Sequence, residues 1–171
     1  AKGVHVVVST GRAYTSLPDY IKNVKGIEYA ITSNGAHIND ISTGEAIYNS
    51  YLSEAAVADI PSVVEETGCD LEIFVDCQAY MDKASYEDMK QNGSTYRNVE
   101  YVLWSRKPID NIMGFMLENS SVIENINLLF HDPDVLEKHR ARVMKIPDAT
   151  ITSSFKTNLE VGGPTTSKKS A

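Results

Sequence analysis

VHVVVSTGR, residues 4–12, joins a run of β-branched residues to a polar Ser-Thr-Gly-Arg end. An apolar run of this kind predicts a strand of a parallel sheet that is covered on both faces. A helical pattern follows at 16–26, with Pro18 in its first turn and Gly26 as its stop. A short strand is expected at 30–32. Strand, helix and strand at this spacing predict a βαβ unit.

The character of the sequence changes after this start. Thr43-Gly44-Glu45 predicts a hairpin between strands at 36–39 and 46–48. Residues 51–152 then mix both kinds of element, which indicates an α+β layer. Further strands are expected at 71–77, 100–104, 125–130, 149–153 and 158–161, and further helices from Ser53 to Gly68, near 86–92 and from Asp132.

Composition and charge exclude several classes of partner. The 171 residues contain 23 acidic and 16 basic side chains, giving a net charge of −7, and no basic cluster favours nucleic acid. Apolar runs such as 6–8 and 112–117 are far shorter than the ~20 residues that cross a bilayer, and no signal peptide opens the chain. Cys69 and Cys77 belong to no CxxC pair, so we expect reduced thiols and a cytoplasmic location.

Two polar loops lie where a ligand of a parallel sheet is expected. Thr10-Gly11-Arg12 and Asn34-Gly35 both follow strands, and ligands bind beyond the carboxyl ends of such strands. A hydroxyl, an unobstructed backbone N–H and a guanidinium together suit an anion such as phosphate. Ordinary turns are the alternative, because Ser-Thr-Gly and Asn-Gly are common turn sequences.

The order of the motifs points to a family. VVVSTGR is followed by TSNGA, a long α+β insertion, NLEV and then TTSKKSA. This layout resembles the Cof-like phosphatases of the haloacid dehalogenase superfamily. In that family a strand-end Thr-Gly-Arg is the second motif, Asn-Gly-Ala follows on the next strand, and a cap domain precedes the third-motif lysine.

The resemblance implies an α/β fold with a partial Rossmann-like core (βαβ) and an inserted α+β cap domain. Residues 1–50 would form part of the core, residues 51–152 the cap, and residues 153–171 the return to the core. Thr10 would hydrogen-bond the transferring phosphoryl group, and Lys168 would neutralise its charge. Phosphate or substrate would further contact Gly11, Arg12, Asn34 and Gly35.

The resemblance also implies a magnesium-dependent phosphatase that acts on small phosphate monoesters, such as a sugar phosphate or a phosphorylated cofactor. Its first motif, a strand that ends in Asp-x-Asp and supplies the nucleophile of the aspartyl-phosphate, would lie before Ala1, and its acidic fourth motif would lie after Ala171. We therefore expect Mg²⁺ to be held largely by residues outside this chain, and this polypeptide alone to be inactive. The chain opens at Ala1-Lys2-Gly3 without a methionine, which indicates a fragment.

Several alternatives remain open at this stage. A non-catalytic ligand-binding or interaction module built on the cap is one, and a phosphotransferase or mutase with the same motifs is another. No metal ligand is assigned, because His131 and His139 are too far apart to share one helical turn. His5 is expected to be a hydrogen-bonded core residue, and His37 a loop residue. An uncovered strand at 4–9 is expected to favour self-association.

Overall fold

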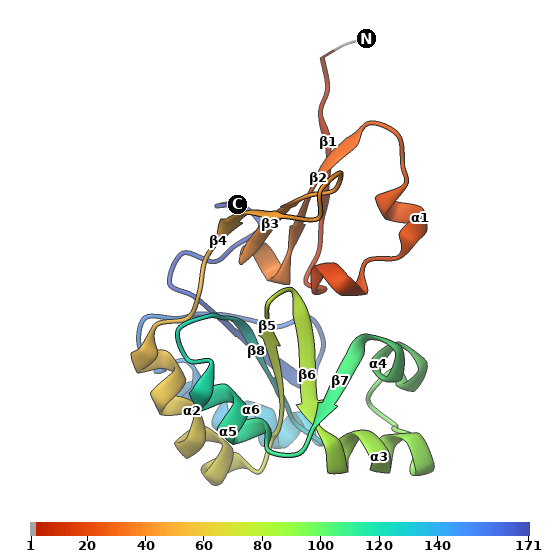
Figure 1. Cartoon of the computed structure of the whole chain (residues 1–171). Helices are drawn as coiled ribbons and strands as arrows, with labels where there is room; N and C mark the ends of the chain where they lie inside the picture. Colours follow the sequence, from red (N-terminus) through yellow and green to blue (C-terminus); the bar gives the residue numbers. More distant parts are fainter. Residues whose placement is uncertain (1–2) are drawn as a thin grey trace.

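The computed structural model describes residues 3–171, which form two units stacked one on the other (Figure 1). The first unit carries a four-stranded sheet in the order β1-β2-β3-β4, and the second a six-stranded sheet in the order β7-β6-β5-β8-β10-β9. The first unit comprises β1 (Val6–Ser9), η1 (Tyr14–Ser16), α1 (Asp19–Lys22), β2 (Ile27–Thr32), η2 (Ser33–Gly35), β3 (His37–Asp40) and β4 (Ala46–Asn49).

The expected βαβ unit is present, although its helix is short. β1 and β2 pair in parallel, whereas β2, β3 and β4 pair antiparallel through the predicted hairpin. The predicted helix at 16–26 is reduced to α1, and a break at 17–18 separates it from η1, which ends at Ser16. Pro18 causes this break, because a proline disfavours helical geometry in the residue before it, and Leu17 is extended with ψ 128°.

The second unit begins with a helix that matches its sequence signals. Ser53 accepts a hydrogen bond from the Ala56 N–H, and Gly68 ends the helix in the left-handed region. The helix continues through Pro61. The elements of the second unit are α2 (Glu54–Thr67), β5 (Asp70–Val75), β6 (Gln78–Asp82), α3 (Lys83–Asn92), α4 (Val99–Ser105), β7 (Arg106–Ile109), α5 (Ile112–Glu118), β8 (Ile123–Leu129), α6 (Pro133–Val143), β9 (Thr150–Thr152) and β10 (Asn158–Gly162).

One predicted strand is wrong. The segment 100–104 lies in helix α4, because the Asn98 side chain accepts a hydrogen bond from the Tyr101 N–H and starts a helical turn there. The strand that follows, β7, instead pairs in parallel with β6.

The last strands join the second sheet. β10 pairs with β8 on one side and β9 on the other. The segment 158–162, which the expected division assigns to the return to the core, therefore lies in the six-stranded sheet.

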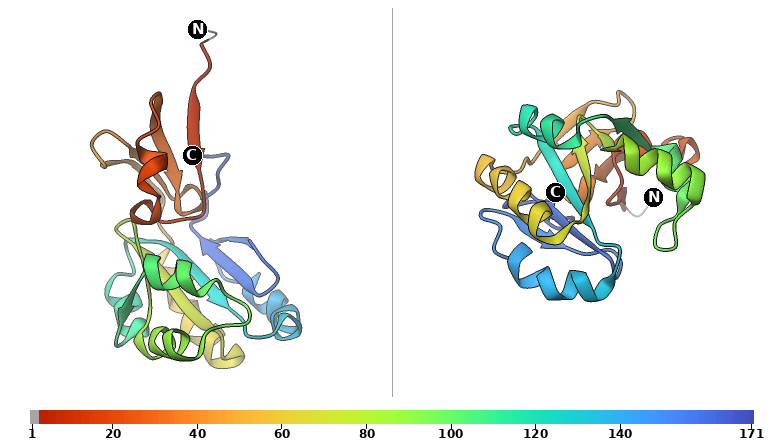
Figure 2. Two further views of the ribbon diagram at one scale, coloured as in Figure 1. Left: turned by 90° about the vertical axis from the view of Figure 1, so that its right-hand side faces the viewer. Right: turned by 90° about the horizontal axis from the view of Figure 1, so that it is seen from below.

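Helices cover one face of the six-stranded sheet. These helices are α2, α5 and α6 (Figure 2). Their apolar side chains pack against alternate residues of β5, β8 and β10. Leu71, Ile73 and Val75 of β5 belong to this core, whereas Glu72 and Phe74 point to the opposite face. The opposite face carries the site described below.

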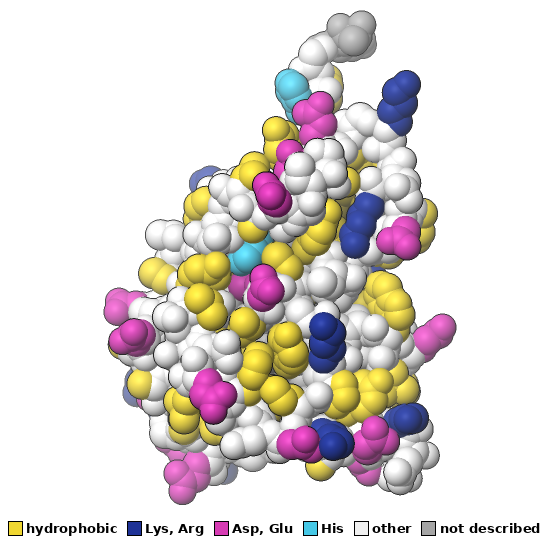
Figure 3. Space-filling view, viewed as in Figure 1, with side chains coloured by type: hydrophobic (Ala, Val, Ile, Leu, Met, Phe, Trp, Pro, Cys, Tyr) yellow, Lys and Arg dark blue, Asp and Glu magenta, His cyan; other side chains and the backbone are white. Residues whose placement is uncertain are grey.

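Strand β1 is not covered on both faces as its sequence predicted. Val6 is 58% exposed and Val7 45% exposed, and apolar side chains lie on the surface of the first unit (Figure 3). Its pattern is that of a buried strand, but within this chain its sheet neighbour is β2 alone. No helix in the described residues is long and apolar enough to span a membrane.

Candidate phosphate-binding site

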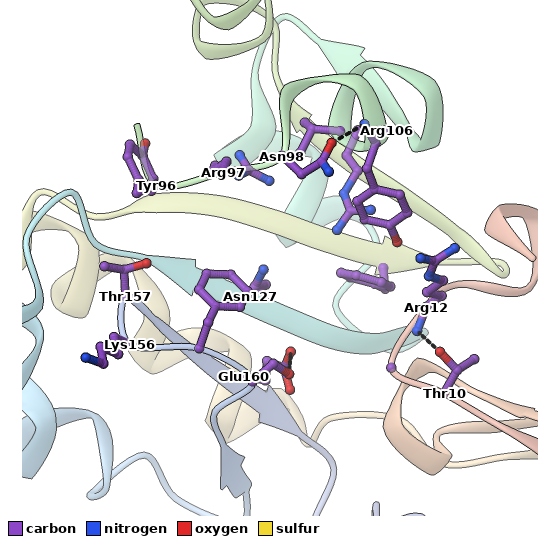
Figure 4. A pocket seen from close by; sticks show the side chains of 16 residues that line it. Thr10, Arg12, Tyr96, Arg97, Asn98, Arg106, Asn127, Lys156, Thr157 and Glu160 are labelled. Atoms are coloured by element: carbon purple, nitrogen blue, oxygen red, sulfur yellow. Dashed lines mark hydrogen bonds between the residues drawn. The ribbon is translucent and has the colours of Figure 1, made fainter. Parts of the chain in front are cut away.

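The two predicted anion-binding loops are joined by backbone hydrogen bonds. The Asn34 N–H donates to the Thr10 carbonyl over 3.2 Å, and the Ser33 N–H donates to the Arg12 carbonyl over 2.8 Å. The Thr10 hydroxyl accepts the Arg12 N–H over 3.2 Å (Figure 4). Parallel pairing of β1 with β2 places both loops at the same edge of the sheet.

Two glycines allow the predicted segments to approach one another. A Cβ on Gly11 would lie 2.6 Å from Oδ1 of Asn34. Gly35 has a φ of +101°, and a Cβ there would overlap the Ser167 carbonyl and lie 2.9 Å from the backbone nitrogen of Lys168. The Asn-Gly loop thus contacts both the Thr-Gly-Arg loop and the segment of the predicted lysine.

The predicted residues line two neighbouring cavities. Thr10, Gly11 and Arg12 line a cavity of about 650 Å³ between the two units. Lys168 and Asn34 line a second cavity of about 350 Å³. Glu160 lies on the boundary and lines both. Its carboxylate accepts the Asn34 side-chain amide over 2.9 Å, and it also accepts hydrogen bonds from Thr152, Ser154 and Asn158.

The larger cavity is bounded on the other side by the polar face of the second sheet. In that sheet Glu72, Asn127 and Glu160 lie side by side on neighbouring strands. Asn127 donates to Glu72 over 3.0 Å and accepts from Asn158 over 3.0 Å. Asn127 is therefore linked to Glu72 directly and to Glu160 through Asn158, and these hydrogen bonds hold the row in place.

Two arginines of the second unit meet at Glu72. Arg106 makes a two-point contact with its carboxylate, with Nε–Oε1 and Nη2–Oε2 distances of 3.0 and 2.9 Å. Arg97 also donates to Oε1 of Glu72. The ring of Tyr101 lies 4.9 Å from the Arg106 guanidinium carbon and 4.5 Å from that of Arg12. Figure 4 shows Arg12 and Arg106 around the same end of the cavity.

Sequence reasoning missed these residues of the second unit. The signal was a polar residue at every second position of otherwise apolar strands, as in Asn125–Asn127 and Asn158–Glu160. Such alternation identifies a polar face of a sheet, but it does not show which distant arginines lie over it.

The described residues do not form a magnesium site. The compact cluster of metal-binding side chains among them is His37, Cys77 and Glu124, whose ligand atoms all lie within 4.8 Å of one another. Nitrogen and sulfur donors do not suit Mg²⁺, which prefers oxygen ligands. Burial raises the pKa of Cys77 to about 11, so this residue is a thiol at neutral pH. Glu160 is the carboxylate on the cavities, and four side chains already hydrogen-bond it.

His37 makes folding sensitive to mild acid. Burial lowers the pKa of its imidazole below the ordinary value of 6.5, and the nearby charge of Glu124 opposes this only in part. Below pH 6.5 the unfolded chain binds a proton at His37 that the folded chain does not. Stability is therefore present above that pH and lost as the pH falls through 6.5 toward the folded-state pKa. Urea unfolding from pH 7.5 to 5.5 should show this loss, and His37→Asn should flatten the slope. An equal slope in both proteins would contradict it.

The chain belongs to the haloacid dehalogenase-like hydrolase family, because the model of that family matches residues 1–171. This confirms the membership of the haloacid dehalogenase superfamily that the order of the motifs indicated. A search of curated proteins finds no match.

Solved structures of this superfamily share the fold. A haloacid dehalogenase-like hydrolase from B. subtilis is 22% identical, with a TM-score of 0.71 over 98% of this chain and 64% of its own. The subclass IIB sugar phosphatase BT4131 is 15% identical (TM-score 0.69; 99% and 60%), and a HAD/Cof-like hydrolase from Plasmodium vivax is 16% identical (0.67; 98% and 59%). The chain thus spans about 60% of the length of these proteins.

Proposed function

We propose that this chain forms the substrate-binding part of a phosphatase that hydrolyses small phosphate monoesters. The contact of Gly35 with Ser167 and Lys168 carries this proposal, because it joins two motifs separated by more than a hundred residues. The first unit would be part of the core, and the second unit the cap that closes over the substrate. Membership of the hydrolase family and the likeness in fold to a sugar phosphatase support this assignment.

In this proposal Thr10 donates its hydroxyl hydrogen to a phosphoryl oxygen, while the Lys168 ammonium offsets the negative charge that develops during transfer. Arg12 and Asn34 contact the phosphate or the leaving group. The attacking carboxylate, and most ligands of the Mg²⁺ that such phosphatases typically use, would come from residues outside these 171. The chain alone would then bind phosphate without hydrolysing its esters.

The test combines a binding and an activity measurement on the 171-residue chain. Inorganic phosphate, titrated by calorimetry, should bind the unsubstituted chain. Lys168→Met should weaken this binding about tenfold to a hundredfold, because a hydrogen bond to a charged group contributes about 1.5–3 kcal/mol. Lys138→Met, which removes an exposed lysine of α6, is the matched control and should change nothing.

Two outcomes would contradict the proposal. Equal phosphate affinity in the parent and the Lys168 variant would remove the lysine from the site. Turnover of p-nitrophenyl phosphate by the 171-residue chain would refute the assignment of the nucleophile to residues outside it. The encoded residues upstream of Ala1 also decide between hydrolase and non-catalytic module: an apolar strand that ends in Asp-x-Asp supports the enzyme.

A further inference from the structure

The cavity wall in the second unit carries more positive charge than its own carboxylates neutralise. The side chains of Arg97 and Arg106 are only 4% and 8% exposed, and both pair with the single, fully buried carboxylate of Glu72. One carboxylate balances one of the two guanidinium groups. The other is offset only in part, by the nearby charge of Asp70, in a place that water reaches poorly, where an unbalanced charge is costly.

The same imbalance holds for the whole cavity. Four cationic residues line it, against the carboxylates of Glu160 at its edge and Glu72 behind its wall. An excess of two positive charges therefore faces this space, although the chain as a whole has a net charge of −7. Charge of one sign collected in a cleft attracts ligands of the opposite sign. The four cations are Arg12, Arg97, Arg106 and Lys156.

Arg97 has a donor that no protein group accepts. Its Nη1 is buried and has no hydrogen-bond partner among the described residues. Burial and the neighbouring charge of Arg106 lower the pKa of Arg97 to about 10. The residue is still a cation at neutral pH, and an anion near it would relieve both the missing hydrogen bond and the repulsion.

Aromatic rings hold Arg106 in place without neutralising it. Its guanidinium carbon lies 4.9 Å from the centre of the Tyr101 ring and 5.7 Å from that of Phe74. Its Nε and Nη2 donate to Glu72 and its Nη1 donates to the Ser105 hydroxyl, so all three nitrogens have partners. Arg106 thus adds fixed positive charge to this wall, whereas Arg97 keeps the donor that a carboxylate or phosphate oxygen can accept.

We propose that the substrate carries a second anionic group, a carboxylate or another phosphate, which binds at Arg97, beside Arg106, while the phosphoryl group to be hydrolysed lies at Thr10. This inference rests on the proposed function, because it names the class of substrate for the same site. A cavity of about 650 Å³ accommodates a small molecule with two such groups.

Two matched pairs of probes test the inference by calorimetry at fixed ionic strength. Glycerol 3-phosphate is compared with 3-phosphoglycerate for the carboxylate, and fructose 1-phosphate with fructose 1,6-bisphosphate for the second phosphate. In at least one pair the probe with two anions should bind about tenfold or more tightly. Which pair shows the gain identifies the anion.

The variants locate the second anion. Arg97→Gln should remove most of that gain, and Arg97→Lys, which keeps the charge and loses the planar fork, should remove part of it. Arg140→Gln removes an arginine of α6 that pairs with Glu137 away from the cavity, and should leave the gain intact. Thermal unfolding of each variant shows whether it is folded, and Arg97→Lys keeps the test available if Arg97→Gln is not.

The outcomes separate this inference from the proposed function. Equal affinity within both pairs would overturn the inference while phosphate binding stands. A gain that survives both Arg97 variants would also overturn it. Failure of every probe to bind would contradict the inference and the proposed function together.

Discussion

Glu72→Ala is expected to lower the free energy of unfolding by about 3–5 kcal/mol, because it leaves the buried cations of Arg97 and Arg106 without a counter-charge. Asn127 loses the acceptor of its side-chain amide as well. Urea denaturation at neutral pH, followed by circular dichroism, measures the change.

Glu137→Ala provides the matched control for this change. Glu137 pairs with Arg140 on the surface of α6, and exposed pairs of this kind contribute about 0–1 kcal/mol. If the two glutamate variants lose the same small amount of stability, Glu72 is not the anchor of the arginine pair.

Gly35→Ala is expected both to destabilise the chain and to abolish its phosphate binding. The new methyl group would overlap the Ser167 carbonyl, so the segment that carries Lys168 must move away from the Asn-Gly loop. The positive φ of +101° adds backbone strain of about 1–2 kcal/mol. Phosphate titration combined with urea denaturation measures both effects.

Gly26→Ala separates the strain from the overlap. Gly26 has a similar φ of +92°, but nothing lies within 4 Å of the position that its Cβ would take. This variant should lose only the strain energy and retain phosphate binding. If Gly35→Ala binds phosphate as Gly26→Ala does, the contact between the two motifs does not position the site.

The elements that sequence reasoning predicted are those with local signals. Helix α2 has its Ser53 cap and its Gly68 stop, and the hairpin around Gly44 has a turn sequence of its own. The prediction of a strand at α4 was wrong because Val99–Ser105 is rich in β-branched and aromatic residues, which favour strands. The signal for a helix there is a single side chain, the Asn98 cap.

In the candidate site too, residues in short local motifs could be predicted from the sequence, and residues placed by the tertiary fold could not. Thr10, Asn34 and Lys168 stand in short motifs that a single sequence displays, whereas their roles remain a prediction. The Glu72 pair could not be predicted, since Arg97 and Arg106 come from a loop and a short edge strand whose positions depend on the tertiary fold. Period-two alternation marks a polar face but carries no information about long-range partners.

The walls of the larger cavity belong to different units, with Thr10 on one side and Arg97 on the other. A ligand long enough to contact both walls binds both units at once and therefore stabilises the arrangement in which they lie close together. Cleaving that ligand between its two anionic groups would leave each product bound to one unit only. Under the proposed chemistry, hydrolysis itself would therefore remove the stabilisation of the closed arrangement and favour release of the products.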